Sequence, residues 1–201
     1  MKESQLFDAT QIDAELSAAR RSGRAMLQDA LSSLKGGGDL YEDDLPFLGF
    51  IERAQAFHIG TVNLVEQGNP LAAVTLLRAY AENLAVVFWV NKRPGELDKL
   101  RPGAKQGLPI GKVVAAAEKG LPGFKALYDH WSGIAHPSGG GAFHTLQVAD
   151  DGQFSWQSHP NFKSTEDARQ VLEWLDDICS LTTTVIKETT ESRRRFLEER
   201  Q

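Results

Sequence analysis

Residues 69–93 read NPLAAVTLLRAYAENLAVVFWVNKR, and this stretch decides the fold. Asn69 is a typical helix cap, and proline at the next position suits the first turn, where no backbone hydrogen bond is needed. The segment 71–90 is apolar on nearly every side, which is typical of a helix at the centre of a bundle. The helix should end before Pro94, because proline cannot continue it. The sequence therefore predicts a central helix around which the others pack.

Outward from this helix, apolar residues recur every three or four positions, which predicts further amphipathic helices. These cover about residues 10–34, 44–67, 110–119, 122–136 and 165–199. The joint at 67–69 is short, so the helix before it and the central helix should form an antiparallel hairpin. From Lys187 onward the last helix becomes polar, and we expect this end to project beyond the core.

Residues 143–157 read FHTLQVADDGQFSWQ, with alternating apolar residues on both sides of an Asp-Gly pair. This pattern predicts a small β-hairpin before the long C-terminal helix. A two-stranded ribbon is marginally stable alone, so it should lie against the helices. The predicted fold is thus all-α: a single helical domain, residues 1–201, built as an up-and-down bundle of about five helices with this hairpin inserted.

The composition is that of an ordinary globular domain, with 41% hydrophobic and 24% charged residues among 201. The formal charge of −5 argues against non-specific coating of nucleic acid, which needs a basic surface. The longest apolar run, residues 84–90, is far shorter than the roughly 20 residues of a membrane span. The N-terminal residues are polar and amphipathic and contain no secretory signal, so we expect a cytoplasmic protein with no membrane partner.

Two charged residues, Arg78 and Glu82, interrupt the central apolar helix. They are four positions apart and therefore lie on one face. An unpaired charge in apolar surroundings costs several kcal/mol, so the two should pair with each other or with a third polar group. One interpretation is a buried structural ion pair. The other is a binding or catalytic pair that faces an internal cleft, because perturbed charges cluster at functional sites.

A second polar set lies in YDHWSGIAHP, residues 128–137. On a helix Tyr128, Asp129, Ser132 and His136 share one face, and the histidine falls in the last turn before proline. These residues either form hydrogen bonds that hold a helix end to its neighbour or belong to a functional site. They lack the strained turn and oxyanion hole of a serine nucleophile. The histidines are too scattered for a metal site, and no motif indicates a cofactor, so we expect neither.

The segments IGTVNLVEQGNPLAAVTLLRAYAENLAVVFWV and YDHWSGIAHPSGG resemble an uncharacterised family of bacterial helical proteins. Members carry Arg-x-x-x-Glu on a central helix and Ser-x-x-x-His near the end of a later one. They are similar in outline to HEPN-type domains, whose best-known members are ribonucleases of toxin or phage-defence systems. The resemblance covers roughly residues 45–165 and picks out Arg78, Glu82, Ser132 and His136.

HEPN ribonucleases place an arginine shortly before a histidine on one late helix. In that motif four to six residues separate the arginine from the histidine. No arginine stands at such a distance before His136 in this chain, whereas Arg53 and His58 have the spacing, in RAQAFH, on an early helix. Two hypotheses about function remain. The first is a non-catalytic or ligand-binding helical module. The alternative, implied by the resemblance, is a HEPN-like ribonuclease in which His136 is the general acid/base and Arg78 stabilises phosphate charge.

For the binding module, the expected ligand is a small polar or anionic molecule or RNA. The residues that would bind it form a buried polar cluster that combines the two segments: Arg78, Glu82, Tyr128, Ser132 and His136. We also expect a homodimer, because the apolar stripe of the last helix is longer than one neighbour can cover and Phe196-Leu197 would otherwise stand exposed.

Overall fold

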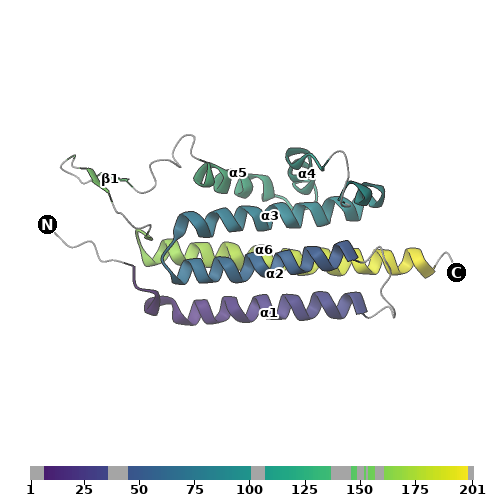
Figure 1. Cartoon of the computed structure of the whole chain (residues 1–201), viewed down its shortest axis with the longest axis horizontal. Helices are drawn as coiled ribbons and strands as arrows, with labels where there is room; N and C mark the ends of the chain where they lie inside the picture. Colours follow the sequence, from purple (N-terminus) through teal and green to yellow (C-terminus); the bar gives the residue numbers. More distant parts are fainter. Residues whose placement is uncertain are drawn as a thin grey trace.

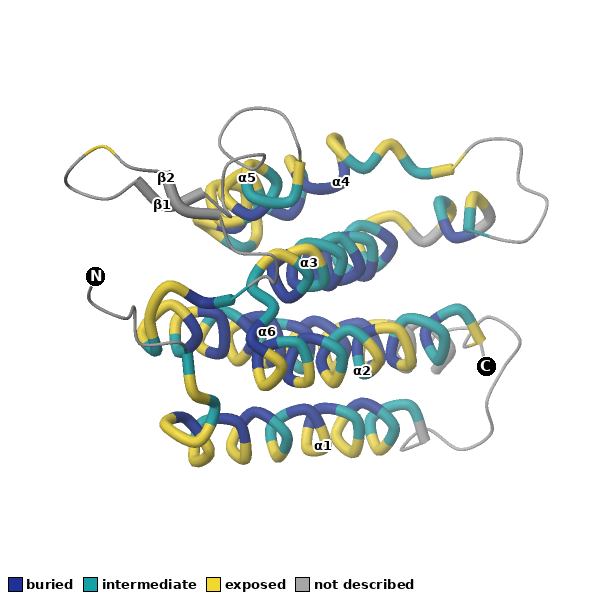
Figure 2. The backbone as a smooth tube through the Cα atoms, turned by 60° about the vertical axis from the view of Figure 1, so that its left-hand side comes forward, coloured by how far each residue is buried: buried dark blue, intermediate teal, exposed yellow. Residues whose placement is uncertain are grey.

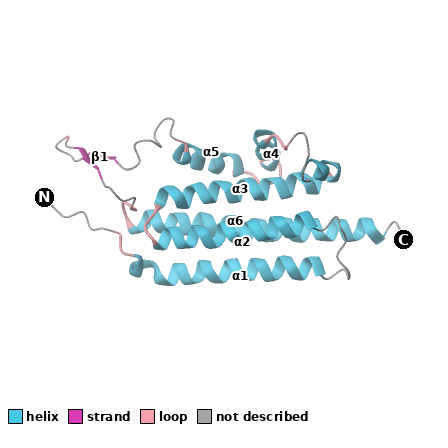
Figure 3. Ribbon diagram, viewed as in Figure 1, coloured by secondary structure: helices cyan, strands magenta, loops and turns pink. Residues whose placement is uncertain are grey.

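The computed structural model describes residues 7–35, 45–100, 107–136, 146–148, 152, 154–156 and 161–198. Its elements in chain order are the 3₁₀-helix η1 (Ala9–Ile12), α1 (Asp13–Lys35), α2 (Leu45–Glu66), α3 (Pro70–Lys92), the 3₁₀-helix η3 (Pro94–Leu100), α4 (Ile110–Ala117), α5 (Phe124–Ala135), β1 (Leu146–Val148), β2 (Phe154–Trp156) and α6 (Thr165–Glu198). The all-helical prediction is confirmed, and Figure 3 shows how completely helices dominate the chain.

The long helices α1, α2, α3 and α6 lie side by side, and α4 and α5 lie along the outer side of α3 (Figure 1). The chain alternates in direction from one pass to the next, with α4 and α5 together forming one pass. The described chain has six α-helices, one for each predicted range, and the bundle has about five passes because a turn that contains Gly120 and Gly123 divides one pass into α4 and α5. Gly123 has a φ of 88°, a left-handed conformation that favours glycine.

Helix α3 is the centre of the bundle, as its sequence predicts. The side-chain oxygen of Asn69 accepts a hydrogen bond of 3.1 Å from the backbone N–H of Ala72, and Pro70 occupies the first turn. Figure 2 shows dark blue, buried positions along much of α3. Its buried residues are Ala73, Val74, Leu77, Tyr80, Ala81, Asn83, Leu84, Ala85, Val87 and Val90. Among the described helices, α3 alone has the length and hydropathy of a membrane span, but these are equally properties of a core helix.

Helix α1 attaches to the bundle through an apolar stripe and through charged pairs at its edges. Its buried side chains are Leu16, Ala19, Met26 and Ala30. Arg20 reaches Glu66 of α2 at 2.7 Å, and Asp29 reaches Lys187 of α6 at 2.7 Å. These pairs are partly exposed and contribute little each, so burial of the stripe supplies most of the attachment.

Strands β1 and β2 pair antiparallel, with Leu146 opposite Trp156. They fall within the range predicted for the hairpin, but most of the turn between them lies outside the described residues, so the hairpin itself stays a prediction. Figure 1 places the two strands beyond the end of the bundle and not along a helix face, which differs from the expected packing. Helix α6 extends past the other long helices at its C-terminal end, as expected from its polar sequence.

Candidate functional site

Arg78 and Glu82 lie on the face of α3 that is covered by α5. Nη2 of Arg78 and Oε1 of Glu82 are 3.0 Å apart, so the two charges pair as expected. The burial is less than expected, since 24% of the arginine side chain and 30% of the glutamate side chain stay exposed. Helix α5 covers this face only in part, although Nε of Arg78 is buried and has no hydrogen-bond partner among the described residues. The prediction of a buried cluster is therefore corrected to a half-buried pair.

Tyr128 of α5 completes this pair. Its hydroxyl donates to Oε1 of Glu82 at 2.8 Å and accepts from Nη2 of Arg78 at 3.1 Å. The guanidinium carbon also lies 5.4 Å from the centre of the tyrosine ring, within range of a cation–π contact. Each member thus contacts the other two. We call these three residues the triad.

The turn before α5 positions Tyr128. The carboxylate of Glu118 accepts hydrogen bonds from the backbone N–H groups of Gly123, at 3.0 Å, and Lys125, at 2.7 Å. These bonds cap the helix and hold the pKa of Glu118 below its usual value. Gly120 allows close approach to α3, because a Cβ there would lie 2.3 Å from the ring of Phe88. Helix α5 is therefore fixed at its first turn, one turn before the tyrosine.

Ser132 lies on α5 and His136 is the C-cap of that helix, and neither side chain makes a hydrogen bond to the triad among the described residues. The hydroxyl oxygen of Ser132 is buried and has no hydrogen-bond partner among the described residues. The backbone N–H of His136 donates to the Ser132 carbonyl at 2.9 Å, and the histidine side chain is exposed at the helix end. It lies eight residues beyond Tyr128, about 12 Å along the axis. Within the described part of the chain no hydrogen bond or ion pair links it to Arg78 or Glu82.

A buried polar group that the sequence does not reveal lies on the other side of α3. His58 of α2 is 1% exposed, and its Nε2 lies 2.7 Å from the carbonyl oxygen of Ala19 in α1. A sequence signal exists in α1, where the small residues Ala19 and Gly23 are four positions apart and allow close helix approach.

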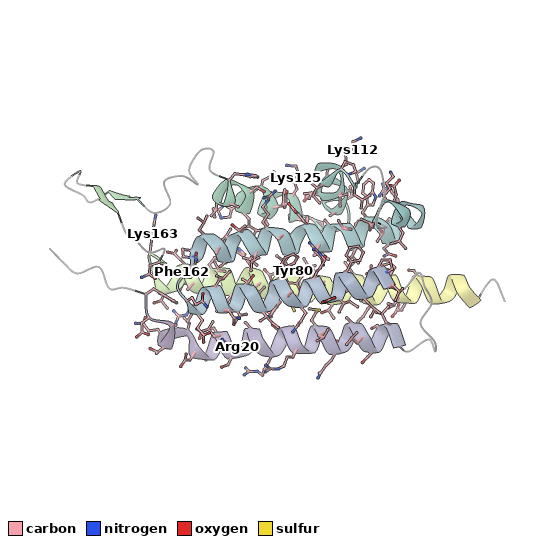
Figure 4. All side chains as sticks on the ribbon, in the orientation of Figure 1. Arg20, Tyr80, Lys112, Lys125, Phe162 and Lys163 are labelled. Carbon is pink, nitrogen blue, oxygen red and sulfur yellow. The ribbon has the colours of Figure 1, made fainter. Side chains whose placement is uncertain are left out.

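Tyr80 and Cys179 lie near this histidine in the interior. The rings of Tyr80 and His58 meet edge to face with centroids 6.3 Å apart, and Figure 4 shows Tyr80 between α3 and the layer of α2 and α6. Burial raises the pKa of the tyrosine hydroxyl, and burial raises that of the Cys179 thiol to about 11. Neither group is suited to titrate or react near neutral pH.

The residues described here contain no group of three His, Cys, Asp or Glu that could hold a metal ion. The triad offers guanidinium donors, carboxylate acceptors and a phenol at a half-exposed helix junction.

Fold and site define an all-helical bundle that carries an Arg–Glu–Tyr triad between its central helix and a covering helix. The chain matches no protein-family model, no curated protein and no solved structure at a significant level. The relationship to HEPN-type domains accordingly stays a hypothesis.

Proposed function

We propose that the chain is a non-catalytic helical binding module and that the triad is its ligand site. The observation that supports this proposal is the incomplete burial of Arg78 and Glu82, 24% and 30% exposed, at a junction of two helices. Because complete burial would cost both charges their hydration, the exposed part of the pair keeps its water, and a polar ligand could take the place of that water. Charged groups kept partly accessible beside apolar surface are typical of binding sites.

The unused atoms of the triad indicate the chemistry of the ligand. The three bonds converge on Nη2 of Arg78 and Oε1 of Glu82, and the second atoms, Nη1 and Oε2, take no part in them. Guanidinium donors suit a carboxylate or phosphate oxygen, which favours a small polar or anionic ligand. The carboxylate of Glu82 would also accept a hydrogen bond from a donor group on the same ligand.

A titration followed by two-dimensional amide NMR tests this site. The probes are inorganic phosphate, acetate and a short single-stranded RNA, added to wild-type protein and to Arg78→Gln. We expect at least one probe to shift amides near Arg78, Glu82 and Tyr128 in the wild type, and the shift to be lost in the variant. Lys112→Gln is the matched control, because Lys112 is exposed on α4 and outside the triad. Absence of localised shifts with every probe would refute the proposal.

Whether the RNA in this titration is cleaved distinguishes a ribonuclease from a module that only binds RNA. That chemistry requires a general acid/base close to Arg78, and no contact in the described structure specifically favours it. RNA cleavage that disappears in His136→Ala would favour the enzyme and contradict a non-catalytic module. RNA that remains intact while it shifts amides around the triad would support binding alone.

A homodimer is the proposed assembly. Its support is the length of α6, 34 residues or about 51 Å, against 23 residues or about 35 Å for α1. The part of α6 beyond the other helices has little neighbouring surface within one chain (Figure 1). Light scattering at tens of micromolar should give twice the 22.1 kDa chain mass. A monomer at that concentration would contradict this assembly.

A further inference from the structure

One buried histidine adds a specific bond to the apolar contact between α1 and α2. Nε2 of His58 lies 2.7 Å from the carbonyl oxygen of Ala19, and the same carbonyl accepts a 3.0 Å hydrogen bond from the hydroxyl of Ser22. The histidine is 1% exposed, so water cannot replace this bond while the helices are in contact. The bond therefore joins a side chain of α2 directly to the backbone of α1.

Gly23 provides the space for the imidazole ring. A Cβ at this position would lie 2.4 Å from Cδ2 and 2.8 Å from Nε2 of His58, far inside van der Waals contact. Any larger residue would push the ring away from the Ala19 carbonyl. The absence of a side chain at Gly23 and the ring of His58 thus form one fitted contact, which we call the clasp.

Only the neutral form of His58 fits the clasp without an energetic penalty. With Nε2 as the donor to Ala19, the neutral ring has a bare Nδ1, which is buried and has no hydrogen-bond partner among the described residues. A second proton would place a charge and an unpaired N–H at this buried position. Burial accordingly lowers the pKa of His58, although the Ala19 carbonyl and the charge of Asp176 oppose the shift.

The groups around the ring do not offset this cost. From α3 the ring meets Tyr80, which stays neutral because burial raises its pKa. From α6 it is influenced by Asp176, which is exposed, and that carboxylate also acts on the buried thiol of Cys179. From α1 it meets the Ala19 carbonyl and Gly23. A screened carboxylate is weaker than burial, so the neutral ring is favoured.

We propose that the clasp is a proton-sensitive attachment, and that protonation of His58 at mildly acidic pH loosens α1 selectively from the bundle. The clasp stabilises the attachment of α1 fully above about pH 6.5, which is the ordinary pKa of an exposed histidine. This stabilisation decreases as the pH falls below that value. The released form binds one more proton than the closed form. Loosening of α1 would uncover apolar surface on α2 and α6, far from the triad and independent of the function proposed for it.

Hydrogen exchange measured by mass spectrometry at pH 7.5 and 5.0, corrected for intrinsic rates, tests this proposal on the intact chain. We expect protection of α1 amides to fall by up to about tenfold per pH unit below 6.5, while protection of α3 amides changes less. His58→Gln keeps an N–H donor but cannot titrate, so its α1 protection should be nearly independent of pH. The matched control His130→Gln, at an exposed position, should behave like wild type.

Three results would overturn the proposal. One is unchanged α1 protection in the wild type between the two pH values. Another is an equal loss in α1 and α3, which would mean general acid destabilisation. The last is an equal pH response in His58→Gln and wild type. If His58→Gln fails to fold, Gly23→Ala gives a second test, because displacing the ring should lower α1 protection already at pH 7.5.

Discussion

Replacing Gly23 by alanine tests the fitted contact between this glycine and the ring of His58. The added Cβ would stand 2.4 Å from Cδ2 of His58, whereas ordinary van der Waals contact begins at 3.4 Å. The ring must therefore move by about 1 Å, the difference between these distances. It is buried on all sides, and the backbone of α1 on which the Cβ stands is held by helical hydrogen bonds. The movement then breaks the bond to the Ala19 carbonyl.

Three contributions set the magnitude. Overpacking of a filled core costs about 1–3 kcal/mol. The lost hydrogen bond costs about 0.5–1.5 kcal/mol. Alanine gains about 1 kcal/mol over glycine in a helix interior. The net expectation is a loss of about 0.5–3.5 kcal/mol in the free energy of unfolding.

Urea unfolding followed by far-ultraviolet circular dichroism measures this loss, and Gly133→Ala is the matched control. Gly133 also lies in a helix, but a Cβ there would meet nothing within 4 Å. Gly133→Ala should raise the free energy of unfolding by about 0.5–1 kcal/mol. The same glycine-to-alanine change should therefore stabilise the protein at position 133 and destabilise it at position 23. In a His58→Ala background the penalty of Gly23→Ala should largely vanish. A Gly23→Ala variant as stable as wild type would refute the contact argument.

Three further predictions concern the triad and the interior. Glu82→Ala should lower the free energy of unfolding by about 1–2 kcal/mol, against at most about 0.5 kcal/mol for the exposed Arg53→Ala, and equal urea midpoints would contradict this order. Tyr128→Phe should cost about 1 kcal/mol, and a double-mutant cycle with Glu82→Ala should show coupling between the two. Burial and a pKa of about 11 make Cys179 unreactive, so a thiol reagent at pH 8 should label it only in urea; rapid labelling of native protein would contradict its burial.

The central helix was predictable because its own residues specify both where it begins and that it is buried. Asn69-Pro70 marks the start, and an apolar run with few charges requires burial on several sides. The pairing of Arg78 with Glu82 follows from a spacing of four, which brings the side chains together on any helix. Such features depend on neighbours within one or two turns. They are the part of a structure that one sequence can specify.

The position of His136 relative to the triad was not predictable in this way. A helical face can be deduced from spacing, and Tyr128 and His136 would share one on a continuous helix, but α5 ends at Ala135 and His136 is its C-cap with an extended backbone. The same spacing separates them by about 12 Å along the axis. Which turn of α5 meets Arg78 depends on how α5 crosses α3, and that depends on the Glu118 cap and on the contact between Gly120 and Phe88. Shared direction was therefore insufficient evidence for a shared site.

Arg53 and His58 show that spacing along the chain is not enough to define a functional pair. Five residues on an α-helix correspond to a rotation of about 140°, so the two side chains point in very different directions. Arg53 is exposed, and its Nε reaches Oδ1 of Asn83 at 3.4 Å, whereas His58 is buried against α1. The partner that explains the histidine is Gly23, a residue with no side chain. A motif defined by functional groups cannot include such a partner, and only the packing of α1 on α2 identifies it.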